Sequence, residues 1–252
     1  MEYIILGNTD LLISRTAFGA QSLEKLEKDD ALSLVKLAYD EGINFFDTSH
    51  LAPKSEALLG EALRGFRDSV ILATKTELCP PQELLNNLEE SLVTLQTDHI
   101  DLYQLEDPSF IPLQGAPDGI YDTLKNLQDS GKIRAIGIAS SDMDIARKTL
   151  DSKLYNCIQF PFNMLSDPKV ESLYQDCFYQ GMGFIAMQPL NGGIVSNIPL
   201  AFGYLNQFEH VIPLWGARSN EELKQILYFS EHPPIIDEKF HKDVESLRMR
   251  FS

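Results

Sequence analysis

The stretch "INFFDTSHLAPKSEALLGEAL", residues 43–63, contains the structural unit from which the fold can be worked out. It starts as a short apolar run that ends at Asp47, and it continues through a loop that contains a proline. Beyond that loop the apolar residues recur with the spacing of an amphipathic helix. The stretch therefore predicts a buried strand, a loop that starts with a carboxylate, and a helix.

The same unit recurs along the whole chain. Eight apolar runs rich in β-branched and aromatic residues have the composition of strands. They are "TAFG" (16–19), "INFFD" (43–47), "VILATK" (70–75), "IDLYQLE" (100–106), "IRAIGIA" (133–139), "NCIQFPF" (156–162), "GFIAMQP" (183–189) and "HVIPLWG" (210–216). Helical periodicity, with Asp, Ser or Pro at several starts, predicts helices between and after them. These helices are expected at Asp29–Glu41, Ser55–Leu63, Pro80–Thr94, Pro117–Asp129, Asp142–Leu150, Pro168–Gln180, Pro199–Asn206 and Ser219–Phe229.

The alternation of strands and helices is typical of an α/β protein. Near-continuous apolar strands joined by helical crossovers indicate a parallel sheet that is covered on both faces. Eight such units favour closure into a TIM (β/α)8 barrel, and a doubly wound open sheet is the alternative. "YIILGNTDLLIS" (3–14) has the pattern of an N-terminal β-hairpin, and "IIDEKFHKDVESLRMRF" (235–251) that of an extra C-terminal helix. No linker rich in Gly or Ser interrupts the pattern, so residues 1–252 are predicted to form one domain.

The composition argues against several classes of partner. A chain of 252 residues with 44% apolar residues can bury a large core. Its formal net charge of −16 argues against nucleic acid and anionic membranes, because both reward clustered Lys and Arg. The three cysteines are widely spaced and form no CxxC pair, so no metal site is expected. Neither a secretory signal nor an apolar run of membrane length is visible, which predicts a cytoplasmic protein.

Ionisable residues end three successive strands of the predicted barrel. They are Asp47, Lys75 and Glu106. In (β/α)8 barrels the chemistry lies where strands end and βα loops begin, so these three side chains are expected around one mouth. Desolvation combined with opposite charges is the environment that tunes active-site groups. The alternative is a buried Asp47–Lys75 ion pair that only fixes the rim, but the third ionisable group favours a pocket.

Eight ordered segments carry a resemblance to a known family. They are "LGNTDLLISRTAFG", "EGINFFDTS" with "KSEALLGEAL", "VILATK", "IDLYQLE", "SGKIRAIGIASSD", "IQFPFNML", "GFIAMQPLNGG" and "IPLWGARSNEEL". Together, and in this order, they make the whole chain resemble the aldo-keto reductases. The resemblance implies a barrel enzyme that transfers hydride from a nicotinamide cofactor, NADP(H) or also NAD(H), to a small carbonyl substrate.

The resemblance to the aldo-keto reductases is incomplete at the reacting centre. Family members carry a catalytic Asp, Tyr, Lys and His, and Asp47 and Lys75 match the Asp and the Lys. Ala52 stands where the proton-donating Tyr is usual, and Glu106 stands where the His is usual. Because an alanine cannot donate a proton, ordinary carbonyl reduction loses a general acid that is typically worth about 10²–10⁴-fold in rate.

Two residues are candidates to replace the missing acid. Glu106 can donate a proton only if an apolar wall keeps it neutral, and Lys75 nearby favours the ionised form. His50 lies in the loop after Asp47, and imidazole titrates near neutral pH, although a lone loop histidine is more often simply exposed to solvent. Strand alternation places Tyr103 on the face opposite Glu106, against the outer helices. The predicted catalytic set is therefore Asp47, Lys75, Glu106 and His50.

The resemblance also implies residues that hold the nicotinamide. Ser140 and Gln159, at the ends of the fifth and sixth strands, match residues that bind the nicotinamide amide, and Asn163 is retained downstream. Met187 stands where many members stack a Tyr on the nicotinamide. Because methionine can also pack against a ring, this change is mild.

The segment "GARSNEEL" (216–223) is similar to the one that opens a helix onto the cofactor phosphates. Gly216, Arg218 and Ser219 fit this role, and Arg218 is the candidate partner of the 2′-phosphate of NADP(H). The alternative is an ordinary helix start with Ser219 as N-cap. Glu222 replaces a frequent Gln and Ile226 a frequent Asn at two positions that usually hold the adenine, which weakens the match.

Three functions are compatible with this sequence. The preferred one is an NADP(H)-dependent oxidoreductase of aldo-keto reductase type that acts on a small molecule with a non-standard catalytic set. The joint loss of the Tyr and the His favours instead a catalytically inactive barrel that binds a nucleotide or regulates a partner. The third is a non-redox lyase, isomerase or dehydratase that uses Lys75 and Glu106 as base and acid. Aromatic residues near the C-terminus, including Phe240 and Phe251, could equally cover the bottom of the barrel or join subunits, which leaves the choice between monomer and homodimer open.

Overall fold

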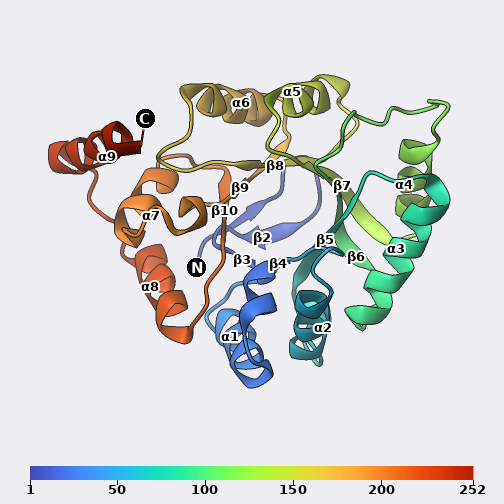
Figure 1. Cartoon of the computed structure of the whole chain (residues 1–252), viewed down its shortest axis with the longest axis horizontal. Coiled ribbons are helices and arrows are strands. Elements are labelled where there is room, and N and C mark those ends of the chain that lie inside the picture. Colours follow the sequence, from blue (N-terminus) through green and yellow to red (C-terminus); the bar gives the residue numbers. More distant parts are fainter. Residues whose placement is uncertain (252) are drawn as a thin grey trace.

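Eight parallel strands close into a barrel in the computed structural model, which describes residues 1–251 (Figure 1). The strands are β3 (Ala17–Gly19), β4 (Phe45–Asp47), β5 (Ile71–Glu77), β6 (Ile100–Glu106), β7 (Ile133–Ala139), β8 (Cys157–Pro161), β9 (Gly183–Met187) and β10 (Val211–Trp215). They follow one another around the barrel in chain order, and β10 pairs with β3 to close the ring. The predicted TIM barrel is confirmed, and the open sheet is excluded.

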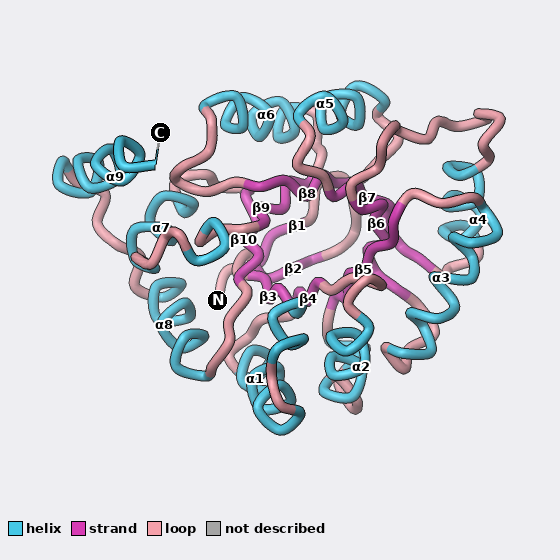
Figure 2. The backbone as a smooth tube through the Cα atoms, in the orientation of Figure 1, coloured by secondary structure: helices cyan, strands magenta, loops and turns pink. Residues whose placement is uncertain are grey.

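Helices form an outer layer around the strands (Figure 2). They are α1 (Lys28–Asp40), α2 (Pro53–Ala62), α3 (Pro81–Thr94), α4 (Ile120–Asp129), α5 (Met143–Ser152), α6 (Pro168–Tyr179), α7 (Ile198–Asn206) and α8 (Asn220–Glu231), with short 3₁₀ turns η1 (Ala20–Lys25), η2 (Arg67–Ser69) and η3 (Asn191–Gly193). The side chains of Asp142 and Ser219 cap α5 and α8 by accepting hydrogen bonds from first-turn N–H groups. The helix predicted at 117–129 begins only at Ile120, because Gly119 adopts a left-handed φ of 65°.

A β-hairpin lies at the N-terminal end of the barrel. Its strands β1 (Tyr3–Ile5) and β2 (Leu12–Ser14) pair antiparallel, as predicted. Leu6, Leu11 and Ile13 are fully buried, and they pack with barrel-interior residues such as Phe45 and Leu102. Because this hairpin fills one end of the barrel with apolar side chains, a ligand can enter only at the opposite end.

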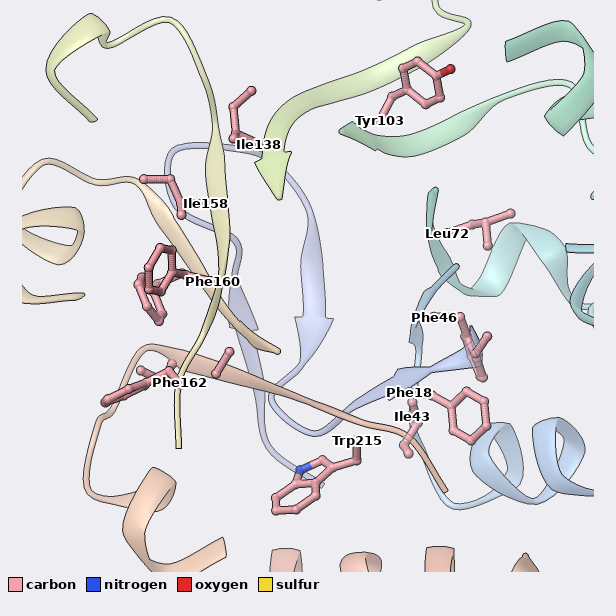
Figure 3. Packing of buried hydrophobic residues seen from close by; sticks show 14 of the residues in the cluster. Phe18, Ile43, Phe46, Leu72, Tyr103, Ile138, Ile158, Phe160, Phe162 and Trp215 are labelled. Atoms are coloured by element: carbon pink, nitrogen blue, oxygen red, sulfur yellow. The ribbon is translucent and has the colours of Figure 1, made fainter. Parts of the chain in front are cut away.

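A second apolar layer lies between the strands and the helices. Figure 3 shows Phe46, Tyr103 and Trp215 pointing away from the barrel centre, and all three belong to the larger buried cluster. Side chains of a strand alternate between its two faces, so the residues that flank these outward side chains point into the barrel. The predicted outward position of Tyr103 is confirmed.

The predicted C-terminal helix is present as α9 (Glu238–Phe251), beside α7 in Figure 1. Phe240 is buried against Gly203 of α7, where an added Cβ would lie 2.7 Å from its ring, whereas Phe251 is exposed. Phe240 is therefore not a surface aromatic that joins subunits, and it covers α7 rather than the barrel end. Across residues 1–251, no helix is long and apolar enough to cross a membrane. The assignment of residues 1–252 to one domain stays a prediction.

Candidate active site

A cavity of about 310 Å³ opens at the C-terminal end of the barrel. Each of the eight barrel strands contributes a lining residue at or near its end, from Gly19 of β3 to Leu214 of β10. Eight of the twelve predicted site residues line this cavity, namely Asp47, Lys75, Glu106, Gln159, Met187, Gly216, Arg218 and Glu222. The strand-end pattern in the sequence therefore located the cavity.

A buried ion pair between Asp47 and Lys75 forms the floor of the cavity. The pairing of β4 with β5 puts Asp47 opposite Ala73, so Lys75 lies two residues further along on the same face. Lys75 Nζ donates to Asp47 Oδ2 at 2.5 Å and to the carbonyl oxygen of Thr48 at 2.6 Å. Both side chains are nearly inaccessible, with exposed fractions of 2% for Asp47 and 3% for Lys75. The predicted ion pair is present, and both of its residues line the cavity.

Two glutamine side chains support the Asp47 carboxylate. Gln104 Nε2 donates to Asp47 Oδ1 at 3.1 Å and to Gln159 Oε1 at 3.0 Å, and Gln159 Nε2 lies 3.5 Å from Asp47 Oδ2. Burial raises the pKa of Asp47, while the charge and hydrogen bond of Lys75 and the two amides act to lower it. Gln104 was not among the predicted site residues. Its signal was a polar residue inside an apolar strand, two positions before Glu106 and hence on the same face.

Two carboxylates at the end of β6 form one wall of the cavity. Glu106 is half-buried, and the buried hydroxyl of Ser49 donates to its Oε2 at 2.6 Å. Asp107 also lines the cavity, and it accepts a hydrogen bond from the backbone N–H of Ser141 at 3.3 Å. The backbone of Asp107 adopts φ 42°, a left-handed conformation that Asp tolerates better than most residues. Ser49 and Asp107 are further candidate site residues, and neither was predicted from the sequence.

The loop after Asp47 does not bring His50 to the cavity. The His50 ring lies against α3, with Nδ1 3.2 Å from Ser91 Oγ and Nε2 3.8 Å from a Glu90 carboxylate oxygen. Ala52 is the residue before α2 and is itself buried, so the position of the usual Tyr is part of the helix start. Neither residue lines the cavity, and we leave His50 out of the proposed catalytic set.

Three predicted cofactor residues lie beside the cavity without lining it. Ser140 Oγ accepts from the N–H of Asp142 at 3.1 Å, which shapes the start of α5. Asn163 Nδ2 donates to the carbonyl of Gln188 at 3.0 Å, which ties β8 to the loop after β9. Ser219 Oγ accepts from the N–H of Glu222 at 3.2 Å as the N-cap of α8. In this structure each of these three side chains stabilises a loop that surrounds the site.

The start of α8 forms the outer end of the cavity. Gly216, Arg218 and Glu222 line it, and the backbone N–H of Arg218 donates to Glu222 Oε2 at 2.7 Å. The N-terminus of a helix favours anions, so this N–H group is available to a phosphate only when the Glu222 carboxylate moves away.

The fold and the cavity together define a (β/α)8-barrel protein whose site lies among the βα loops. Comparison with known families then gives a narrower assignment. The model of the aldo/keto reductase family matches residues 15–210, and the chain therefore belongs to the aldo/keto reductase family.

Individual relatives agree with this family assignment. The chain is 31% identical over 196 residues to the aldo-keto reductase YhdN of Bacillus subtilis, a match that covers 69% of this chain and 57% of YhdN. It is 30% identical over 215 residues to L-galactose dehydrogenase of Arabidopsis thaliana, covering 78% of this chain and 67% of that protein. The match to YhdN thus leaves more than a third of that relative unmatched.

Solved structures show the same fold. The holo form of the aldo-keto reductase AKR11C1 from Bacillus halodurans superposes with a TM-score of 0.84 at 23% identity, covering 98% of this chain and 96% of that one. An aldo-keto reductase from Klebsiella pneumoniae, solved in complex with NADPH, superposes with a TM-score of 0.83 at 20% identity, covering 98% and 95%.

Proposed function

We propose that this protein is an NADP(H)-dependent oxidoreductase that acts on a small carbonyl or related unsaturated substrate. NAD(H) is the alternative cofactor. The observation that carries the proposal is the convergence of Asp47, Lys75, Gln159, Met187 and Arg218 on one cavity, in a chain of the aldo/keto reductase family. Oxidoreductases among its relatives, and a Klebsiella pneumoniae structural neighbour solved with NADPH, support the same function.

The residues around the cavity fit a nicotinamide nucleotide. Gln159 offers an amide to a carboxamide, and Met187 offers a polarisable side chain against which a flat ring can pack. Gly216 and Arg218 would hold the phosphates at the start of α8, where Arg218 supplies the positive charge. When bound, the reduced nicotinamide supplies a hydride. The carboxylate of Glu222 opposes a 2′-phosphate, so the preference for NADP(H) over NAD(H) is expected to be small.

Lys75 is the residue that would polarise the substrate. Its ammonium group donates to two acceptors, Asp47 and the Thr48 carbonyl, which leaves one N–H for a ligand in the cavity. Asp47 fixes the position of the ammonium group, because the two buried charges depend on each other at this depth. Gln104 in turn orients Asp47. Asp47 and Gln104 are therefore positioning residues for Lys75.

Turnover of reduced nucleotide tests this function. Purified protein is given NADPH or NADH with a panel of carbonyl, imine and enone compounds, and loss of nucleotide absorbance is followed. We expect turnover that Lys75→Met lowers by at least about 100-fold, the scale of one lost group that stabilises the transition state. Bound nucleotide without turnover of any compound would contradict an enzymatic role.

One observation favours a second function. Ala52 lies at the start of α2, and no tyrosine among residues 1–251 lines the cavity to replace the usual one. This second function is that of an inactive barrel that binds a nucleotide and regulates a partner. Nucleotide binding without turnover would support it, whereas a requirement for Lys75 without any nucleotide binding would favour a non-redox lyase, isomerase or dehydratase. A cytoplasmic location and a monomeric or homodimeric state stay predictions.

A further inference from the structure

We call the part of the cavity lined by Asp47, Lys75, Glu106 and Asp107 the substrate end. Its side chains are unsuited to reducing a neutral carbonyl. Hydride addition to a carbonyl leaves a negative oxygen that must be protonated or stabilised. Among residues 1–251, the cavity lining includes no tyrosine, histidine or cysteine that could donate that proton. It includes instead the carboxylates of Glu106 and Asp107, which would lie beside the developing negative charge. Repulsion between these carboxylates and the negative oxygen raises the energy of the transition state, so the carboxylates oppose the reaction.

Lys75 is poorly suited to give up a proton at this site. Its Nζ lies 2.5 Å from Asp47 Oδ2, and both side chains are almost completely buried. Loss of a proton from the ammonium group would leave the Asp47 carboxylate buried without a cation, which is strongly unfavourable. Lys75 can therefore polarise a neutral acceptor, but it does not replace a general acid, and an iminium cation makes no use of its remaining N–H.

The carboxylate wall is held in place by the surrounding structure. The buried Ser49 hydroxyl donates to Glu106 Oε2, and the Ser141 N–H donates to Asp107 Oδ1. The other carboxylate oxygen of Glu106 has no hydrogen-bond partner among the described residues, so it is available to a ligand. Since Asp47 and Lys75 neutralise each other, these two carboxylates give the substrate end a formal charge of −2. Two carboxylates beside the same cavity favour a cation there.

We infer that the substrate is an iminium cation, with its positive C=N group against Glu106. The inference rests on the proposed function, because it names the substrate class of the same site. The iminium carbon accepts a hydride from reduced nicotinamide and forms a C–H bond. The π electrons of the C=N bond become the nitrogen lone pair, so the product is a neutral amine and the nicotinamide takes the positive charge. No proton is required, and no negative charge develops beside Glu106 and Asp107.

Binding of a permanent iminium cation tests this inference in the absence of nucleotide. The probes are 1,2-dimethyl-1-pyrrolinium and the neutral 2-methylcyclopentanone, which has a similar shape. Calorimetry should show the cation binding at least about 10-fold more tightly than the ketone. Glu106→Gln should weaken cation binding by about fivefold or more, the upper range for a partly exposed charge pair, because this cation has no N–H to donate, and it should leave ketone binding little changed.

The matched control is Glu41→Gln, the same chemical change at the residue that follows α1. Glu41 is exposed, precedes β4 at the opposite end of the barrel and lies outside the lining of the cavity, so cation affinity should stay within about twofold. With NADPH or NADH added, the pyrrolinium cation should be reduced faster than the ketone, and its rate should not increase as the pH falls, because no protein acid takes part.

Two results would overturn the inference while the proposed function stands. One is a ketone that binds and is reduced as well as the cation, and the other is full cation affinity in Glu106→Gln. Failure of both nucleotides to bind the wild-type protein is a different result, because it removes the proposed function itself.

Discussion

Replacing Lys75 with methionine should destabilise the protein more than replacing Lys75 and Asp47 together. At the 2.5 Å separation of Nζ and Oδ2, two unit charges attract by about 7 kcal/mol at an effective dielectric constant of about 20. Most of that attraction is offset by the cost of removing both charges from water. Removal of one partner alone leaves the other charge buried, which typically costs about 3–5 kcal/mol. For a chain of this length, we expect the melting temperature of Lys75→Met to fall by about 6–10 °C.

The destabilisation of Lys75→Met should depend on pH in a defined direction. Burial raises the pKa of Asp47, and removal of the Lys75 charge raises it further. A carboxyl whose pKa is higher in the folded state than in the unfolded state binds its proton preferentially in the folded state. Stability therefore increases as the pH falls through the folded-state pKa towards the unfolded value of about 3.9. The deficit of Lys75→Met should be largest at neutral pH and shrink in acid.

Urea unfolding at pH 7.5 and pH 5 measures this effect for wild type, Lys75→Met, and Lys75→Met combined with Asp47→Asn. The double variant has no buried charge at the site, so it should recover most of the lost free energy of unfolding. A deficit below about 1 kcal/mol, within the usual range for an exposed pair, would refute a buried, mutually dependent pair. A deficit that is the same at both pH values would refute the proposed role of the Asp47 proton.

Three further substitutions test other parts of the structure. Glu222→Gln should tighten NADPH binding about fivefold relative to NADH, because it removes a partly exposed carboxylate worth about 1 kcal/mol from the proposed 2′-phosphate site. An unchanged ratio of NADPH affinity to NADH affinity in calorimetry would contradict this. Gly60→Ala should lower the free energy of unfolding by about 2 kcal/mol or more, because its Cβ would lie 2.6 Å from the Leu95 backbone. At Gly216 the atoms nearest to an added Cβ are 3.7 Å away, so Gly216→Ala should lower the free energy of unfolding by less than about 0.5 kcal/mol in urea unfolding. Equal losses in the two glycine variants would refute the close packing of Gly60 in α2 against the Leu95 backbone.

Much of the fold follows from local patterns in the chain. The apolar runs and the helical segments are long enough for their periodicity to be distinct, and their number predicts the closed barrel. The boundaries were less accurate where single residues decide them. Gly119 delays the start of α4, and the left-handed φ of 56° at Gln188 ends the run predicted as 183–189 at Met187.

The candidate site was predictable where it depends on strand ends. Asp47, Lys75 and Glu106 meet because parallel strands in a barrel end at the same rim. Ser49 and His50 could not be placed in this way, because they lie in a loop where side-chain directions depend on how the chain enters α2. The turn that leads to Pro53 directs one side chain to Glu106 and the next to α3.

Three of the predicted cofactor residues lie outside the lining of the cavity. Ser140, Asn163 and Ser219 use their side chains on nearby backbone groups, as short polar residues in loops often do. The sequence shows that such residues follow the strands. It does not show whether a side chain bonds its own loop or faces the cavity, because that depends on loop geometry.

The most direct test of the central claim is a calorimetric titration of wild-type protein and Arg218→Ala with NADPH and NADH. A nucleotide site at the barrel mouth predicts saturable binding of both nucleotides to wild type. It also predicts a loss of NADPH affinity in Arg218→Ala of about 10-fold, as expected for one charge-assisted phosphate contact, with a smaller change for NADH. The absence of binding of either nucleotide to wild-type protein would contradict the claim that this cavity is a nicotinamide nucleotide site.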